Sequence, residues 1–192
     1  DCLLSRGLGD VYKRQLNNNP GTIVTEEHEA MEAVVIRGVS IERSQARVTI
    51  TGIPDEPGMS GRILAVLGDD EINIDMIVSN IAHDGYARHS FTMHTHDLGR
   101  AQASLKPVLS ELGGEADLET EAGIAKLSVV GIGMRSHSGV AAQMFKVLGE
   151  AGINIGMIST SEIKISITVD ETCIEDAARV VHKVFELDTA PG

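Results

Sequence analysis

Residues 52–58, GIPDEPG, have the residue types and the setting for binding a small charged molecule. They follow an alternating apolar run and precede apolar residues at helical spacing, which predicts a loop between a strand and a helix. The first N–H groups of a helix have no partners inside it and attract anions. Asp55 offers a carboxylate to a cation. This pair suits the carboxylate and ammonium of a free α-amino acid, and the alternative is an Asp-Pro turn with a helix cap.

A second glycine-rich loop, residues 131–139 (GIGMRSHSG), resembles a phosphate-binding loop only superficially. It lacks the GxGxxG pattern and the Walker lysine, so nucleotide binding is not expected there. Ser136 and His137 are adjacent within it, but adjacent side chains on an extended segment diverge and no orienting acid is evident. We therefore expect no catalytic constellation in this chain.

Asn73 and Asn154 recur at the start of equivalent predicted strands. Each amide either contacts a ligand or satisfies local backbone groups. Asp75 and Ser79 share a strand face with Asn73, because side chains alternate along a strand. The counterpart of Asp75 in the second copy is Gly156, so the two pockets are expected to differ chemically.

Three histidines, His89, His94 and His96, lie close together in the sequence. On a strand, His94 and His96 share a face and His89 points the other way. Without a nearby carboxylate or thiolate they make a poor metal site, and we expect a solvated sheet face. Cys2 and Cys173 are far apart and indicate neither a disulfide framework nor a zinc site.

Two stretches of the chain repeat one pattern 81 residues apart. Aligning 58–77 with 139–158 makes nine of the twenty positions identical, where chance gives roughly one or two. Each copy reads as a strand, a turn, a helix and a second strand beginning Ile-Asn-Ile, which opens a βαβ-type unit. We interpret the chain as two copies of one unit.

Composition limits the function of these 192 residues. The net charge of −12 argues against a nucleic-acid partner, which requires clustered Lys and Arg. No run of about 18 apolar residues is present, so no membrane span is expected. We see no secretory leader, and we expect a reduced cytoplasmic protein.

Apolar periodicity predicts two helices in each unit, and Pro107 is expected to kink or split the second helix of the first unit. The second unit lacks its last strand, and the surplus strand candidate at 33–41 fits that vacancy and removes a bare edge. The predicted helices lie near 58–69, 98–112, 138–150 and 172–186, and the other predicted strands near 46–52, 72–81, 88–96, 115–121, 125–133, 153–160 and 163–169.

These elements predict an α+β fold of two βαββαβ units, with the N-terminal strand completing the second unit. The predicted boundaries are a non-native or disordered leader at 1–15, a linker at 16–32, a first unit at 44–122 and a second unit formed by 33–43 plus 123–188.

Taken together, the motifs resemble the paired, ferredoxin-like ACT domains at the C-terminal end of aspartate kinase. The resemblance covers about residues 16–187 and is carried by GIPDEPG, INIDM, SHSGV and INIGMISTSEIKIS. NNNPGTIVTEE resembles the end of the kinase catalytic domain, so residues 16–32 are expected to include its remnant. MEAVVIRGVS resembles the start of a separately made regulatory subunit.

The resemblance implies that the first unit of one chain pairs with the second unit of another, with threonine at the seam. Ser79 stands where many relatives carry Gln, and its shorter side chain lacks the amide donor, which bears on threonine affinity and selectivity. The implied threonine-type residues are Asp55, Pro57, Gly58, Met59, Ser60, Asn73, Ser79, Asn154 and Ile155. The implied lysine-type residues are Asp75, Ser136, His137, Gly139, Val140, Thr160, Ser161 and Glu162.

The implied function is feedback inhibition of aspartate kinase by threonine, lysine or both, in the biosynthesis of the aspartate-family amino acids. The kinase domain is not part of this sequence, so we expect no kinase activity from the chain alone. No cofactor is expected here, since ATP and Mg²⁺ would bind only in that domain. The implied partners are a second copy in a homodimer, the kinase domain or catalytic subunit, and the effector.

Two alternatives remain at this point. One is a tandem ACT amino-acid sensor of a different enzyme or regulator. The other is an enzyme on a ferredoxin-like scaffold, which would need a catalytic cluster that the sequence does not show.

Overall fold

A computed structural model of the chain describes residues 10–12, 22–24, 36–81, 85–112, 116–131 and 139–187. Near the N-terminus, β1 (Asp10–Tyr12) and β2 (Thr22–Val24) pair antiparallel in a sheet of their own. The rest of the predicted leader and linker lies outside the described residues, as do Ser136 and His137.

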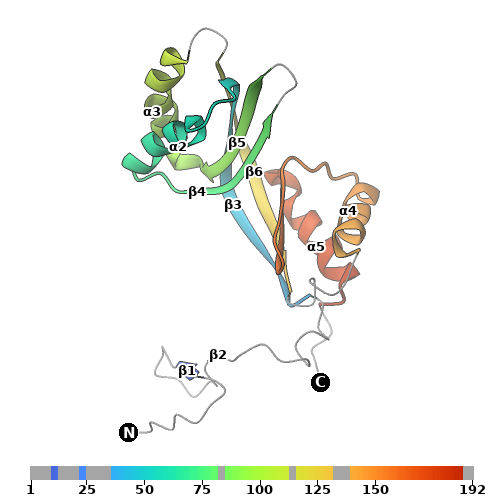
Figure 1. Cartoon of the computed structure of the whole chain (residues 1–192). Coiled ribbons are helices and arrows are strands. Elements are labelled where there is room, and N and C mark those ends of the chain that lie inside the picture. Colours follow the sequence, from blue (N-terminus) through green and yellow to red (C-terminus); the bar gives the residue numbers. More distant parts are fainter. Residues whose placement is uncertain are drawn as a thin grey trace, which may run out of the picture.

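The main sheet has six antiparallel strands in the order β4-β5-β3-β6-β8-β7 (Figure 1). Within it, β4-β5-β3-β6 and β7-β8-β6-β3 each have the strand order of a ferredoxin-like unit. The predicted fold class is therefore confirmed. The strands are β3 (Gly38–Pro54), β4 (Ile74–Ile81), β5 (Tyr86–His94), β6 (Asp117–Val130), β7 (Ile158–Thr160) and β8 (Lys164–Asp170).

The two central strands, β3 and β6, serve both units. The first part of β3 pairs with 126–130 of β6, and the rest pairs with 117–122. The register shifts between Glu42 and Ala46, where Ser44 has a φ of +55°. The sequence predicts two strands here, near 33–41 and 46–52. They form the single strand β3, because the residues on both sides of the bulge stay hydrogen-bonded to β6. The N-terminal segment thus completes the second unit, as expected.

In the part of the chain that the structure describes, two helices cover the sheet in each unit. In Figure 1, α2 (Met59–Asp69) and α3 (Leu98–Glu111) lie on the first unit, and α4 (Val140–Glu150) and α5 (Ile174–Val184) lie on the second. Short 3₁₀ turns, η1 (Thr95–Asp97) and η3 (Glu171–Cys173), precede α3 and α5.

Pro107 does not split α3, although a split was one expected outcome. The missing proline N–H and the ring clash disfavour a helix interior by about 3 kcal/mol. Ala101 and Leu105 are nevertheless fully buried on the inner face of the helix. We attribute the continuity of α3 to this apolar packing.

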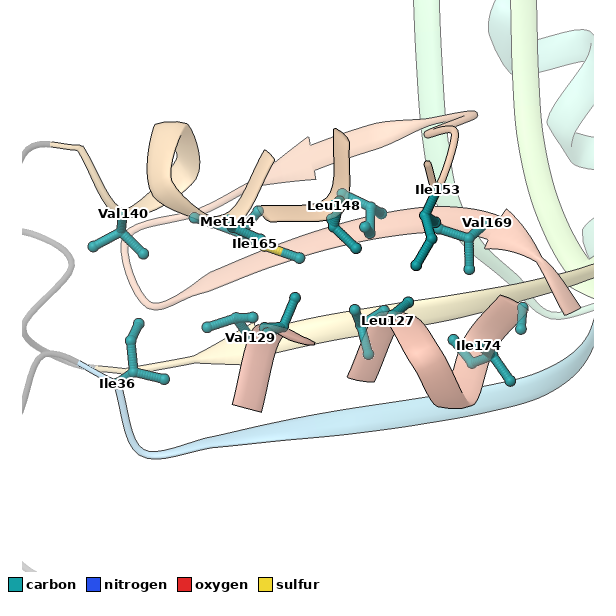
Figure 2. Packing of buried hydrophobic residues seen from close by; sticks show 14 residues of the cluster. Ile36, Leu127, Val129, Val140, Met144, Leu148, Ile153, Ile165, Val169 and Ile174 are labelled. Atoms are coloured by element: carbon teal, nitrogen blue, oxygen red, sulfur yellow. The ribbon is translucent and has the colours of Figure 1, made fainter. Parts of the chain in front are cut away.

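Each unit has its own apolar core. In the first core, Ile63 and Leu67 of α2 are fully buried together with Phe91 of β5. Figure 2 shows the second, in which Met144 and Leu148 of α4 lie over β6 and β8. Burying each such side chain contributes about 1.5–3 kcal/mol. The repeated helical spacing in the sequence therefore produces two equivalent cores.

Within the part of the chain that the structure describes, no helix is long and apolar enough to cross a membrane. The same residues contain no group of three or more His, Cys, Asp or Glu side chains placed to hold a metal ion.

Candidate functional site

The loop before α2 leaves the start of that helix open. The backbone N–H of Asp55 donates to the carbonyl of Gly85 at 3.0 Å, which ties the loop to the β4–β5 connection. Gly58 takes the N-cap position with a φ of 95°, a conformation that glycine adopts without steric cost. No side chain among the described residues caps α2. Residues 57–58 form a turn and Gly58 caps the helix through its backbone, so the alternative of an Asp-Pro turn with a helix cap stays open.

His89 joins two of the implied threonine-type residues. His89 lies on β5 and is 4% exposed. Nε2 lies 2.8 Å from the hydroxyl of Ser60 on α2, and Nδ1 lies 3.0 Å from the hydroxyl of Ser79 on β4. A neutral imidazole has one donor and one acceptor nitrogen, so one serine donates to the ring and the other accepts. The ring thereby fixes Ser60 and Ser79 beside the helix start.

The expectation of a solvated face is wrong for His89. The residue pairs with Ser79 in the sheet and follows the buried alternation of β5 that includes Phe91. The two hydroxyls satisfy the ring, which allows a polar side chain to stay buried. His94 and His96 are exposed, with their Nδ1 atoms 2.7 Å apart, and His96 lies in η1 rather than on the strand. The period of β5 was the one sequence signal that could have placed His89.

The other implied threonine-type residues do not all meet within one chain. Pro57 and Met59 belong to the same loop and first turn as Ser60. Asn73 borders a cavity of the first unit, whereas Asn154 and Ile155 border a cavity of the second. Their joint role requires a seam between two chains and stays a prediction.

Asp75 is already engaged inside the chain. Lys126, whose side chain is 3% exposed, pairs its Nζ with Asp75 Oδ2, and with Glu42 Oε1 at 2.8 Å. Burial alone lowers the pKa of Lys126, but the hydrogen bonds and charges of Asp75 and Glu42 outweigh it and raise the pKa. Lys126 is therefore held protonated. An effector lysine would have to compete with it for the carboxylate of Asp75.

The lysine-type residues are dispersed within a single chain. Gly139 caps α4 with a φ of 102°, and Val140 is buried in the second core. Residues 160–162 lie exposed at the β7–β8 turn, where the N–H of Ser161 donates to the carbonyl of Lys164 at 2.7 Å. Asp75 lies at the junction of the two units instead. The proposed lysine site therefore also stays a prediction.

Comparison with known proteins first gives the class of the chain. One family model described as an ACT domain matches residues 46–111, and another ACT-domain model matches residues 127–185. These ranges correspond to the helix-covered sheets of the two units. The chain is thus a tandem ACT protein.

Individual relatives give the family. The chain is 42% identical to a chain in a crystal structure of aspartokinase alpha and beta subunits, covering 79% of this chain and 99% of that one, with a TM-score of 0.72. The ligand-free regulatory subunit of aspartate kinase from Thermus thermophilus is 36% identical, with the same coverage and TM-score. This chain belongs to the aspartate kinase family and forms a regulatory ACT region.

Longer relatives show what share of a full-length protein this chain covers. The aspartate kinase Ask_LysC of Stutzerimonas stutzeri is 44% identical over 174 residues, which is 90% of this chain and 42% of that protein. The aspartokinase of Helicobacter pylori is 40% identical over 182 residues, 93% of this chain and 44% of that protein. The chain spans under half the length of these relatives.

Proposed function

We propose that this chain senses an aspartate-family amino acid and transmits its level to an aspartate kinase, giving feedback inhibition. The observation that carries the proposal is the group formed by Ser60, His89 and Ser79 beside the uncapped start of α2. The kinase in this proposal is inferred from the membership of the chain in the aspartate kinase family. The position of the group beside the start of α2 supports the α-amino acid that the loop sequence suggests as the ligand.

Threonine is the effector that this chemistry favours. Its carboxylate would meet the N–H groups at the start of α2 and its ammonium would meet Asp55. Its hydroxyl would exchange hydrogen bonds with the serine hydroxyls that His89 orients. Lysine is less favoured, because Lys126 already pairs with the carboxylate of Asp75.

The edges of the sheet support a homodimer. Among the described residues, β4 and β7 each have a strand neighbour on one side only, so one edge of each presents backbone groups that can pair with another chain. Ile77 on β4 and Ile158 on β7 occupy equivalent positions of the repeat and are 51% and 45% exposed. We propose that β4 of one copy lies against β7 of the other, which would bring Asn154 and Ile155 of the second copy to the threonine site.

The control of the kinase is explained by thermodynamic linkage between effector binding and the arrangement of the two copies. An effector that bridges two copies stabilises the arrangement it binds best, and can shift the equilibrium only by that difference in affinity. Such couplings amount to about 1–3 kcal/mol. We propose that this arrangement holds an attached kinase domain, or a catalytic subunit, in an inactive state in the cytoplasm. ATP, Mg²⁺ and aspartate would bind that partner.

Isothermal titration of the chain with threonine and lysine, preceded by a thermal-shift panel of the twenty amino acids, tests the proposal. Threonine is expected to bind and stabilise the chain, and Asp55→Ala is expected to weaken binding at least tenfold. Asp69→Ala, at the far end of α2, is the matched control and should change nothing. Stabilisation by an amino acid outside the aspartate family alone would refute the proposal, and unchanged threonine binding in Asp55→Ala would remove Asp55 from the site.

A further inference from the structure

A pair of histidines lies where β5 leads into α3. The Nδ1 atoms of His94 and His96 are 2.7 Å apart. The ring centroids are farther apart, at 4.4 Å, with the ring planes tilted by 49°, so the two Nδ1 atoms are on the facing sides of their rings. Both residues are exposed, and 68% of the side chain of His96 is in contact with solvent. The pair therefore directs two ring nitrogens to one point at the surface.

The second unit forms the same turn without such a pair. Asp170 and Thr172 precede and lie in η3, as His94 and His96 precede and lie in η1. The side chain of Asp170 accepts a hydrogen bond from the N–H of Thr172 at 2.8 Å and thereby caps its turn. No side chain among the described residues caps η1. The two histidines are thus not the cap of their turn, and their contact needs another explanation.

A buried carboxylate orients His96. Oδ2 of Asp97 lies 3.2 Å from Nε2 of His96, and Nη1 of Arg100 donates to Oδ1 of the same carboxylate at 2.9 Å. Only 8% of the side chain of Asp97 is exposed. A carboxylate beside Nε2 favours the proton on that nitrogen and leaves Nδ1 with its lone pair. Histidines that bind metal ions have this arrangement, in which the second ring nitrogen faces a carboxylate.

The charges around the pair favour a cation. The two histidines border a cavity of about 520 Å³. The charged residues on its border are Glu42, Glu71, Asp75, Asp97 and Arg100. Lys126 adds a second positive charge, because it pairs with two of these carboxylates. Four carboxylates therefore face two cations, which leaves an excess of negative charge beside the imidazoles.

We infer that His94 and His96 bind a divalent transition-metal ion through their Nδ1 atoms, with water as the remaining ligands. The described residues contain no group of three or more side chains placed to hold an ion, so the protein supplies two ligands. Without the ion, His94 donates its Nδ1–H to Nδ1 of His96. On binding, His94 carries its proton on Nε2 instead, and two neutral imidazoles face the ion.

Geometry and ligand type define the class of ion. Metal-to-nitrogen distances of about 2.0–2.1 Å place two ligands about 2.9–3.4 Å apart for angles between about 90° and 110°. The two nitrogens reach this separation from 2.7 Å by small rotations of exposed side chains. Imidazole suits Cu²⁺, Ni²⁺ and Zn²⁺, with Cu²⁺ the tightest, whereas Mg²⁺ and Ca²⁺ prefer oxygen ligands. The inference does not depend on the proposed effector site at α2.

Long-range ¹H–¹⁵N NMR of the imidazoles tests this inference on the ¹⁵N-labelled full chain, titrated with ZnCl₂ and separately with MgCl₂. Zn²⁺ is expected to give saturable shifts of Nδ1 in both His94 and His96, with one midpoint for the two residues. Mg²⁺ at the same concentrations should shift neither nitrogen. Absence of a saturable Zn²⁺ shift at either Nδ1, or an equal response to Mg²⁺, would overturn the inference.

Variants test whether the two rings act together. His94→Gln is expected to weaken Zn²⁺ binding at His96 at least tenfold, because a single imidazole does not chelate, and His96→Gln should weaken binding at His94 likewise. Asp97→Asn should weaken binding about tenfold through the orientation of His96. His182→Gln, on α5 of the second unit, is the matched control and should change nothing. Circular dichroism checks that each variant is folded, and equal Zn²⁺ affinity at His96 in wild type and folded His94→Gln would contradict a shared site.

Discussion

The two ACT units share a backbone but differ where the first helix meets the sheet. In the first unit, Ser60, His89 and Ser79 form a connected polar group. The equivalent positions of the second unit are Ala141, Ile165 and Thr160, and Thr160 pairs with Ile165 as Ser79 pairs with His89. One scaffold therefore holds a connected polar group in one copy and mostly apolar side chains in the other. The proposed site therefore depends on a few side chains that differ between the copies, rather than on the fold that they share.

The apolar cores of the two units should contribute equally to stability. Truncating a buried leucine in either core should have the largest effect of the changes considered. Leu67 and Leu148 occupy matching positions of the repeat, and both are fully buried. Leu67→Ala and Leu148→Ala should each lower the free energy of unfolding by about 3 kcal/mol, because each leaves a cavity. Urea unfolding followed by circular dichroism measures both. A difference larger than about 1.5 kcal/mol between them would contradict equivalence of the cores.

Lys126 and Arg47, the two cations on the central strands where the units meet, should contribute differently to stability. Lys126→Met should lower the free energy of unfolding by about 2–3 kcal/mol, less than a fully buried pair because Asp75 and Glu42 are about half exposed. Arg47→Met should have an effect of about 1 kcal/mol or less, since Arg47 is more exposed and pairs, among the described residues, with Glu121 alone. Urea unfolding compares the two variants. A larger loss of stability in Arg47→Met than in Lys126→Met would contradict this ranking.

Making the first unit resemble the second should reduce ligand binding more than stability. His89→Ile places the residue type of position 165 in the first unit. We expect threonine affinity to fall about tenfold, or about 1.4 kcal/mol, because Ser60 and Ser79 lose the ring that orients them. His94→Gln, at an exposed histidine, is the matched control. Calorimetric titration that gives equal affinities for wild type and His89→Ile would exclude His89 from the site.

The smallest predicted effect is a dependence on alkaline pH. The pKa of Lys126 is raised above 10.5 in the folded chain. A raised pKa contributes stability that is fully present below about pH 10.5 and is lost as the pH rises through the folded value. The stability difference between wild type and Lys126→Met should therefore shrink above that pH. Urea midpoints for both proteins at about pH 8 and about pH 11.5 measure it, and a constant difference would contradict a raised pKa.

Sequence reasoning predicted the fold well because two copies of the same apolar periodicity reinforce each other. The open start of α2 was predictable too, since the glycine and proline residues at 54–58 restrict the backbone locally. His89 was misplaced because the three histidines were interpreted as one solvated group, although the period of β5 puts His89 on the same face as the buried Phe91. Nothing in the sequence linked Lys126 with Asp75, which lies 51 positions away, because the two meet only when the strands of both units assemble.

The central claim is that the first unit, and not its copy, provides the helix-start site for the effector. Backbone NMR of the ¹⁵N-labelled chain titrated with threonine tests this claim most directly. The account predicts the largest shifts at Ser60, Ser79 and His89, with little change at Ala141, Thr160 and Ile165. Shifts of equal size in both sets, or shifts confined to the second set, would contradict it.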